Sequence, residues 1–419
     1  MRAPLDMSAF AELQGLLDKL AVFGAEAGGG VTRLLYTEPW RAAQLFLEER
    51  MRAAGLETRF DRAGNLYGRL LGADPAAPVV LTGSHVDTVR SGGRYDGAYG
   101  IAAGLLAVAA LKRTCGAPLR TLEVVSLCEE EGSRFPLAYW GSGNATGVYG
   151  LEDGAGIADA DGITLAEAMR EAGFGLEAQT PCLRRDIGAF VELHIEQGIA
   201  LERSGRRIGL VEAIVGQRRY AVTLTGASNH AGTTPMSMRA DALAGAAEML
   251  ALLETRAKAA GDPLVATAGR LEAMPGTPNV IPGEVRFTLD IRHDEDAMLE
   301  SFCRDTLAAF AAIARRRGLG FASRIWLASK PVPMDGGLTG LLERACLARA
   351  YSSRRMVSGA GHDAQLFAAV CPAAMLFVPS RGGVSHSPDE YSAPLHLQEG
   401  AAVLADCLYE LTYGQEWQR

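Results

Sequence analysis

Residues 78–88 read Pro-Val-Val-Leu-Thr-Gly-Ser-His-Val-Asp-Thr, an apolar run that ends in a loop of small residues with a histidine and an aspartate. Two further apolar runs, 121–127 and 189–193, also lead directly into acidic residues or a histidine. An alanine- and leucine-rich segment with helical spacing, 100–112, lies between the first two runs. This alternation predicts an α/β layered domain. Because open α/β sheets bind ligands at the C-terminal ends of their strands, the polar groups there are candidate site residues.

The pattern changes at about residue 215. Residues 220–225 and 284–291 alternate apolar and polar side chains, as half-buried strands do. Further strands are predicted at 263–271 and 321–327, and helices at 237–256 and 294–317. We therefore expect a four-stranded antiparallel sheet with two helices on one face.

An α/β pattern returns after residue 331, with a buried strand at 374–378. His386 lies in this last part and is a candidate partner for groups near residues 85–194. The sequence thus predicts a catalytic domain with a mostly parallel sheet, built from residues 1–214 and 329–419. Residues 215–328 would form an α+β lid inserted into it.

Five side chains offer imidazole or carboxylate ligands to metals, namely His85, Asp96, Glu131, His194 and His386. Each has an ordinary alternative: the histidines suit polar surface loops, and Asp96 suits a helix N-cap. As a set they could hold two divalent metals bridged by one carboxylate, an arrangement used in hydrolysis. Asp87 faces the same way as His85 on an extended chain and could orient its imidazole.

Three glutamates, Glu129, Glu130 and Glu131, follow the predicted strand 121–127. On a solvated surface such a triplet is unremarkable. After an apolar strand it places like charges near the edge of the core, where cations would offset repulsion and desolvation. Neighbouring side chains of an extended segment point apart, so Glu131 on a metal leaves Glu130 able to reach a water.

The predicted lid carries four candidate substrate-binding groups, namely Gln217, His230, Asn279 and Arg292. His230 lies in a loop of small residues and is either a turn histidine or a group that stabilises an oxyanion. A guanidinium such as that of Arg292 suits a substrate carboxylate, although arginines on strands are commonly solvated.

Composition describes an ordinary globular protein of 419 residues, 48% hydrophobic and 21% charged, and too long for one compact core. The net charge of −8 argues against a nucleic-acid partner. We find no signal peptide and no apolar stretch long enough to span a membrane. Seven scattered cysteines without a Cys-x-x-Cys pair indicate reduced thiols and a cytoplasmic protein.

Several motifs resemble the amidase, hydantoinase and carbamoylase branch of the M20 metallopeptidase family, over nearly the full length. They are residues 83–89, 129–135, 194–198, 229–236, 359–364 and 385–386. Residues 30–36, 65–70 and 215–220 are similar to the group of that branch that hydrolyses allantoate.

The resemblance implies that His85 and His194 bind one metal, that Glu131 and His386 bind the other, and that Asp96 bridges them. The two divalent ions would be zinc or manganese, with cobalt or nickel as further choices. Glu130 would be the general base, and Asp87 would orient His85.

For the lid, the resemblance implies that Gln217, His230, Asn279 and Arg292 contact substrate. It also implies a homodimer through the lid, in which some of these groups serve the active site of the partner subunit.

The reaction implied is hydrolysis of a ureido C–N bond in a small carboxylate, with allantoate as the first choice. An N-carbamoyl-L-amino acid, ureidoglycolate or 3-ureidopropionate could occupy the same site. A dipeptidase on the same scaffold and a catalytically silent metal-binding protein are the more distant alternatives.

Overall fold

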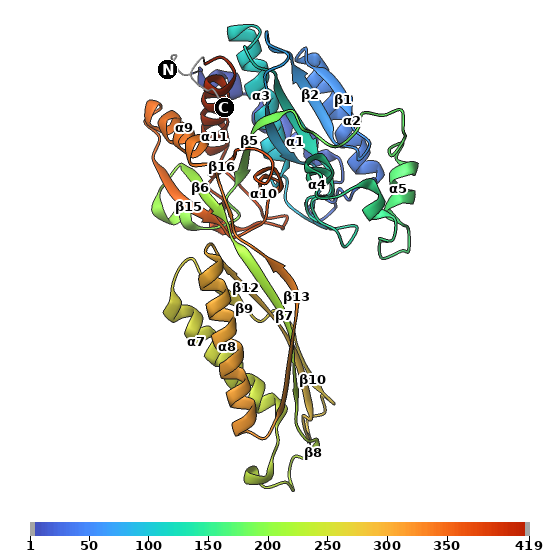
Figure 1. Cartoon of the computed structure of the whole chain (residues 1–419), viewed down its shortest axis with the longest axis vertical. Helices are drawn as coiled ribbons and strands as arrows, with labels where there is room; N and C mark the ends of the chain where they lie inside the picture. Colours follow the sequence, from blue (N-terminus) through green and yellow to red (C-terminus); the bar gives the residue numbers. More distant parts are fainter. Residues whose placement is uncertain (1–4, 415–419) are drawn as a thin grey trace. The chain divides into compact units, whose positions relative to one another are not determined.

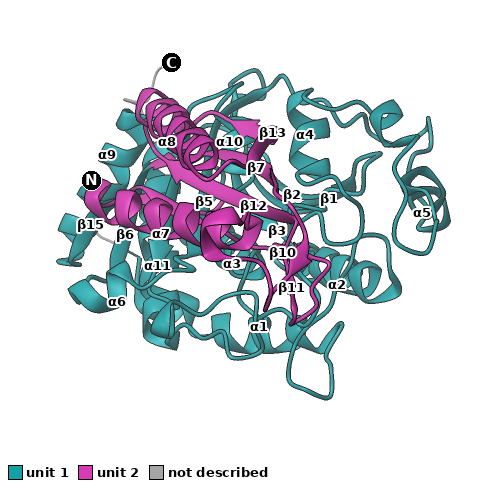
Figure 2. Cartoon of the chain, turned by 90° about the horizontal axis from the view of Figure 1, so that it is seen from below, with its two compact units in different colours: residues 1–212, 333–356, 361–419 teal, residues 213–332, 357–360 magenta. Residues whose placement is uncertain are grey.

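The computed structural model describes residues 5–414 and divides the chain into two compact units, coloured separately in Figure 2. Unit 1 comprises residues 1–212, 333–356 and 361–419, and unit 2 comprises residues 213–332 and 357–360. Unit 2 is thus an insertion into the chain of unit 1. The corresponding boundaries predicted from the sequence fall after residues 214 and 328.

Nine strands of the described chain form one sheet (Figure 1). They are β1 (Glu57–Phe60), β2 (Leu66–Leu70), β3 (Val79–His85), β4 (Leu122–Leu127), β5 (Ile187–Ile195), β6 (Ile208–Ile214), β14 (Val332–Pro333), β15 (Ser353–Ser358) and β16 (Ala373–Val378). Their order is β1-β2-β4-β3-β5-β16-β6-β14, with β15 paired to β6.

The four central strands, β4, β3, β5 and β16, run parallel to one another. On either side of them, β1 with β2, β2 with β4, and β6 with β16 pair antiparallel. The expectation of a mostly parallel sheet therefore holds for the centre, and the sheet as a whole is mixed. The central strands β3, β4 and β16 are buried along their whole length, as expected of parallel strands covered on both faces.

The helices of unit 1 include three of sixteen residues or more. The α-helices are α1 (Leu13–Val22), α2 (Glu38–Ala53), α3 (Ala98–Cys115), α4 (Trp140–Thr146), α5 (Leu165–Glu171), α6 (Ala200–Ser204), α9 (Gly336–Ala348), α10 (Ala364–Phe367) and α11 (Pro394–Thr412). Short 3₁₀ turns are η1 (Met7–Phe10), η2 (Leu151–Gly154) and η4 (Arg381–Gly383).

Helix α3 packs against strands β3, β4 and β5 and against helix α11. No stretch able to span a membrane was predicted from the sequence, yet α3 has the length and apolar composition for it. Its apolar window is 67% buried inside the protein. A helix that is apolar all round and enclosed in this way is the central helix of a core.

Unit 2 has its own hydrophobic core, between a sheet and two helices. Its elements are β7 (Gly216–Thr225), β8 (Asn229–His230), η3 (Met236–Met238), α7 (Ala242–Ala260), β9 (Val265–Thr267), β10 (Leu271–Met274), β11 (Val280–Ile281), β12 (Glu284–His293), α8 (Asp296–Arg316) and β13 (Gly320–Ser329). Alternate residues of β7 and β12 are buried, so one face of the sheet meets the helices.

The main sheet of unit 2 has five strands, and the prediction of four is wrong by one. The strand predicted at 263–271 is two short strands, β9 and β10, which both pair antiparallel with β12. Thr267 stands opposite Asp290, and Leu271 stands opposite Phe287. Between these two pairs, residues 268–270 lie opposite only residues 288–289 of β12, so one residue is extra. The extra residue breaks the ladder there, as a bulge does.

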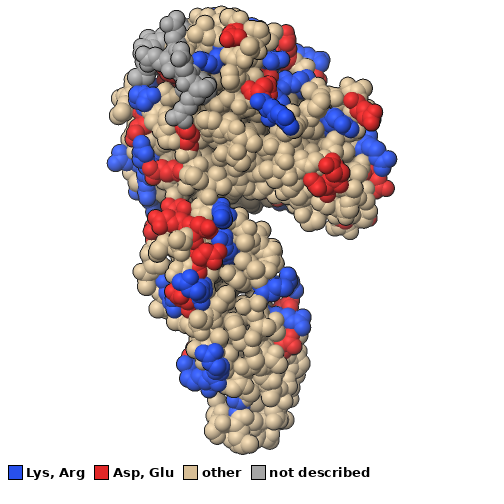
Figure 3. All heavy atoms as spheres, in the orientation of Figure 1, with Lys and Arg blue, Asp and Glu red and all other residues tan. Residues whose placement is uncertain are grey.

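On the face that Figure 3 shows, basic and acidic side chains are interspersed over both units, in keeping with the modest net charge of −8.

Candidate metal centre

The five predicted ligands all belong to unit 1, and the parallel strands explain why they meet. His85 is the last residue of β3 and stands opposite Leu127, the last residue of β4, so Glu129–Glu131 follow at the same edge. His194 is the last residue but one of β5, on the other side of β3. Neighbouring parallel strands thus deliver an imidazole, a run of carboxylates and a second imidazole to one edge of the sheet.

Asp96 lies at the centre of the cluster. Its Oδ1 is 3.1 Å from His194 Nε2 and 3.4 Å from His85 Nε2. Its Oδ2 is 3.3 Å from His386 Nε2, and that nitrogen is 3.4 Å from Glu131 Oε1. The Asp96 carboxylate therefore faces three imidazoles. Its Oδ1 is directed toward His85 and His194, and its Oδ2 toward His386.

Three groups of side chains offer ligand atoms that all lie within 4.8 Å of one another. They are His85–Asp96–His194, Asp96–Glu131–His386 and His85–Glu130–Glu131. The first two groups share Asp96, which is the pairing that the family resemblance implies. The ligand and catalytic roles of these residues stay predictions.

Backbone carbonyls fix the two buried imidazoles. His85 Nδ1 lies 3.0 Å from the carbonyl oxygen of Asp87, and His194 Nδ1 lies 2.9 Å from that of Ile195. With Nδ1 bonded in this way, each ring turns Nε2 toward Asp96. The Asp87 carboxylate is farther from His85, at 3.9 Å, and accepts the backbone N–H of Glu131 at 3.2 Å. The shorter contact of Asp87 with His85 is therefore made by its main-chain carbonyl and not by its carboxylate.

Room for the first ligand depends on Gly97, which precedes α3 and has a φ of 62°. A Cβ at this position would lie 2.4 Å from the carbonyl oxygen of His85 and 2.5 Å from its ring. Any side chain at 97 would therefore displace His85, and only glycine adopts such a φ without strain.

Burial and crowding shift the protonation of the cluster. Burial raises the pKa of Glu130 well above 4.5, and burial and then Asp96 raise the pKa of Glu131 to about 7. Burial also raises the pKa of Asp96, but hydrogen bonds with His194, His386 and His85 outweigh it and hold it well below 3.8. The hydrogen bond to Asp96 raises the pKa of His386 to about 9.

These shifts mean that protons on imidazoles compensate the buried carboxylates of the cluster. Divalent cations would replace those protons, because metal ligands must be deprotonated. Two buried oxygens with no hydrogen-bond partner among the described residues belong to side chains that contact the cluster, namely Asp87 Oδ1 and Gln197 Oε1. The donor set of imidazoles and carboxylates thus fits zinc, manganese, cobalt or nickel.

Three residues that contact the cluster were not among the predicted site residues. Gln197 Nε2 donates to Asp96 Oδ2 at 2.8 Å, and Ser385 Oγ lies 3.2 Å from the same oxygen. Glu390 accepts the backbone N–H of Asp96 at 3.1 Å. Gln197 and Ser385 stand beside His194 and His386 in motifs already singled out, whereas nothing in the sequence marks Glu390.

His362 and Asp363, in a motif for which the sequence suggested no role, are also buried here. The His362 ring meets that of His194 edge-on, with centroids 4.6 Å apart. Burial, then the charge of His194, lowers the pKa of His362 well below 6.5, so it is a neutral packing partner. Asp363 accepts a hydrogen bond from Ser142 Oγ at 2.6 Å.

The four predicted substrate-binding residues all lie in unit 2, in two separate pairs. Gln217 and Arg292 stand opposite each other where β7 begins. His230 and Asn279 lie beyond the other end of β7, where the Ala231 N–H donates to Asn279 O. From Gln217 to Thr225, the last residue of β7, the extended chain advances eight residues, a span of ~26 Å. One unit 2 therefore does not bring the four residues together.

His230 is exposed, and its Nδ1 accepts the backbone N–H of Gly232 at 3.0 Å and of Thr233 at 3.2 Å. These two bonds make Nδ1 the acceptor nitrogen, so Nε2 carries the proton of the neutral ring. A proton on Nε2 suits the predicted stabilisation of an oxyanion.

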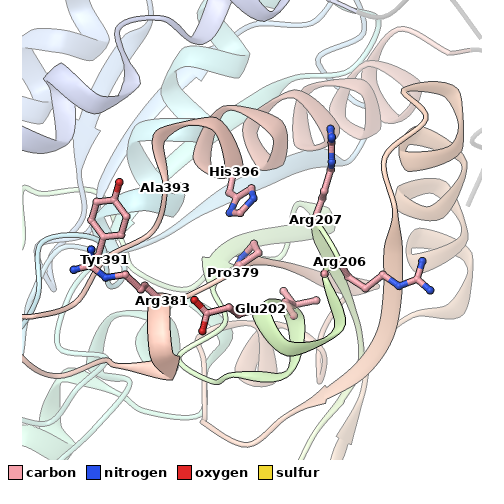
Figure 4. A pocket seen from close by; sticks show the side chains of 10 residues that line it. Glu202, Arg206, Arg207, Pro379, Arg381, Tyr391, Ala393 and His396 are labelled. Carbon is pink, nitrogen blue, oxygen red and sulfur yellow. The ribbon is translucent and has the colours of Figure 1, made fainter.

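Unit 1 contains a cavity of about 360 Å³ whose lining Figure 4 shows. Leu201, Pro379, Arg381, Tyr391 and His396 are among its lining residues, and none of the predicted site residues is. The cavity therefore lies outside the metal cluster.

The chain matches the family model described as peptidase family M20/M25/M40 over residues 81–410. It is 51% identical to an allantoate amidohydrolase of Bacillus subtilis, across 95% of this chain and 96% of that protein. It is 47% identical to an allantoate amidohydrolase of Escherichia coli, across 97% of this chain and 98% of that protein.

Among solved structures, an amidase of the hydantoinase/carbamoylase family from Burkholderia multivorans superposes with a TM-score of 0.92. It is 37% identical to this chain and covers 97% of it, and 98% of that structure is matched. The resemblance carried by the sequence motifs is thereby confirmed. On these matches, and with the cluster that its parallel strands assemble, the chain belongs to peptidase family M20/M25/M40.

Proposed function

We propose that the protein is a metal-dependent amidohydrolase that cleaves a ureido C–N bond of allantoate. The observation that carries the proposal is the sharing of Asp96 between two ligand groups, with Glu130 beside both. The likeness to two allantoate amidohydrolases over nearly the whole chain supports the choice of substrate. The products would be ureidoglycine, carbon dioxide and ammonia.

Two divalent cations are proposed for each subunit. His85 and His194 would hold one and Glu131 and His386 the other, with one oxygen of Asp96 for each. Cations bound there would lower the pKa of the attacking water and polarise the scissile carbonyl. Zinc or manganese is the first choice, and availability decides between them and cobalt or nickel.

Glu130 is the proposed general base. It is 8% exposed, and its Oε2 lies 3.9 Å from His85 Nε2. Glu130 therefore lies beside the proposed ligands but belongs to neither of the two groups that share Asp96. Burial raises its pKa well above 4.5, which makes its carboxylate a stronger proton acceptor than an exposed one. It would take a proton from the attacking water and deliver it to the nitrogen of the leaving amine.

The two pairs in unit 2 would supply substrate binding. Arg292, beside Gln217, would hold the substrate carboxylate, and His230 would donate Nε2–H to the developing oxyanion. Because the pairs lie at opposite ends of β7, we propose a homodimer through unit 2. One pair would act in the site of its own subunit and the other in that of the partner.

A cytoplasmic location is proposed on the state of the cysteines. Six of them are buried thiols, namely Cys128, Cys182, Cys303, Cys346, Cys371 and Cys407. Burial raises the pKa of Cys128 well above 9, which makes it unreactive, and a reducing compartment suits such thiols.

The second candidate function is hydrolysis of an N-carbamoyl-L-amino acid, with the same cluster and base. The superposition on a hydantoinase/carbamoylase amidase favours it. Substrates of the two kinds differ in what joins the carboxylate to the ureido group, and a few side chains of the substrate pocket decide between them.

The test is ammonia release from the purified, manganese-loaded protein. Allantoate, a panel of N-carbamoyl-L-amino acids and a panel of dipeptides are run in parallel, with free amino acid followed in the same tubes. Preference for allantoate is expected. Preference for a carbamoyl amino acid would leave the proposed site intact but contradict allantoate as the substrate. Hydrolysis of dipeptides alone would contradict the assignment as an amidohydrolase.

A further inference from the structure

The loop formed by residues 380–392, here termed the His386 loop, closes on itself at its base. The Arg381 N–H donates to Tyr391 O at 2.8 Å, and the Arg381 guanidinium lies over the Tyr391 ring, 4.3 Å from its centroid. Figure 4 shows these two side chains next to each other. His386 itself has a φ of 53°, in a region that residues other than glycine seldom adopt. Contacts from the surroundings must therefore hold this conformation.

Glu390 supplies such contacts, and it joins the His386 loop to the segment that carries Asp96. Its Oε1 accepts the backbone N–H of Tyr95 at 2.9 Å and that of Asp96 at 3.1 Å. Its Oε2 accepts the hydroxyl of Ser385, the residue before His386, at 2.8 Å. One carboxylate thus joins the bridging aspartate to its histidine partner, which is 290 positions later in the sequence.

The surroundings of Glu390 are shaped for this carboxylate. Glu390 is 4% exposed, and a Cβ at Gly93 would lie 2.0 Å from its Oε1. The glycine therefore leaves the space that the carboxylate fills. Glu390 belongs to none of the ligand groups found among the described residues, and both its oxygens accept hydrogen bonds.

We propose that Glu390 is a positioning residue for the second cation site. It fixes the separation between Asp96 and His386, whose Oδ2 and Nε2 lie 3.3 Å apart. This inference rests on the proposed function, because it assigns Glu390 a role toward a cation held by Asp96, Glu131 and His386. Outer partners of metal ligands commonly affect metal affinity by 10- to 100-fold.

Three substitutions separate position from charge. In Glu390→Gln the amide oxygen still accepts both N–H groups, and the NH₂ reaches the Ser385 oxygen, so affinity for the second cation is expected within ~3-fold of wild type. Glu390→Asp is one methylene too short to reach both segments. We expect Glu390→Asp and Glu390→Ala to bind the second cation 10- to 100-fold more weakly and the first with little change.

The experiment titrates the metal-free full-length protein with Zn²⁺ against a chromophoric chelator, and with Co²⁺ while recording its absorption spectrum. Glu399→Ala is the matched control. Glu399 is also a buried carboxylate of the C-terminal region, 2% exposed, but it pairs with Arg207 and belongs to none of the ligand groups among the described residues. The control is expected to bind both cations as wild type does.

Equal affinities in wild type and Glu390→Ala would overturn the proposal, as would an equal loss in Glu399→Ala. A loss in Glu390→Gln as large as in Glu390→Ala would show that charge, not position, matters, and would also overturn it. If Glu390→Ala does not fold, Glu390→Asp decides in its place. Wild-type protein that binds no cation would instead refute the proposed function, so the two failures are distinguishable.

Discussion

Asp290 binds Arg292 through both carboxylate oxygens: Oδ1 accepts Nε–H and Oδ2 accepts Nη2–H, each at 2.9 Å. The two residues lie two positions apart on β12, so their side chains share one face of the sheet. Asp290 Oδ2 also accepts Nε–H of Arg219 at 2.8 Å, and Arg292 Nη1 donates to Gly359 O at 2.7 Å. The guanidinium proposed to hold the substrate carboxylate is therefore fixed in orientation before substrate arrives.

Replacing Arg292 with Lys tests this preorganisation. Lysine keeps the charge but loses the planar fork that pairs with Asp290 and with a carboxylate. KM for allantoate is expected to rise by roughly 10- to 100-fold, with kcat changed far less. The control is Arg219→Lys, which contacts the same aspartate but is not assigned to substrate. A steady-state comparison in which both variants raise KM equally would contradict the assignment of Arg292.

The pH dependence of stability tests the Asp290 contacts. Burial raises the pKa of Asp290, but the hydrogen bond and charge of Arg292 and the charge of Arg219 outweigh it and lower this pKa below 3.8. A carboxyl with a lowered folded-state pKa stabilises the fold at pH values above its unfolded pKa of about 3.9, and this contribution is lost as pH falls through the folded pKa.

Asp290→Asn is therefore expected to lower the free energy of unfolding by ~1 kcal/mol at pH 7. The difference from wild type should be the same at pH 5 and shrink below pH ~3.9. Urea unfolding at pH 7, 5 and 3.5 measures it. A difference that grows as the pH is lowered would show that the variant acts by another route.

Glu130→Gln separates the general base from metal binding. The variant keeps the shape of the side chain but cannot accept the proton of the attacking water, so kcat is expected to fall by ~10²- to 10⁴-fold. Metal content after gel filtration should match that of wild type, because Glu130 is not among the proposed ligands. Retained turnover would remove Glu130 from the role of base, and lost metal would make it a ligand instead.

How far the sequence predicts the site depends on how local its signals are. His85 and the Glu129–Glu131 run follow apolar strands, so their meeting at one sheet edge could be predicted. The contact of Glu390 with Asp96 spans 294 positions and rests on backbone N–H groups, which leave no residue pattern. Periodicity also gives the side on which Asp87 lies but not that its carbonyl, rather than its carboxylate, meets His85.

The same limit applies to unit 2. The alternation in residues 284–291 predicted a strand correctly, but the break between β9 and β10 arises from how both pair with β12. A register difference of one residue between partners has no signature in either strand alone. Five strands in place of four therefore required the tertiary structure.

The separation of His230 from Arg292 gives a test of the proposed homodimer through mixed subunits. Glu130→Gln and His230→Ala are each expected to be nearly inactive alone. If His230 serves the partner's site, a heterodimer of the two variants has one complete site, with Glu130 from the His230→Ala chain and His230 from the other. Random exchange of subunits would then restore roughly a quarter of wild-type activity, because half of the dimers are mixed and each has one working site. If His230 acts within its own subunit, mixing restores nothing, since every site lacks one of the two groups.

Activity is measured before and after exchange, and the Glu130→Gln chain mixed with a Glu131→Ala chain is the control. Both of those substitutions lie in unit 1, in the cluster that each chain forms from its own residues. A partner subunit therefore cannot replace either side chain, and this mixture should stay inactive under either arrangement.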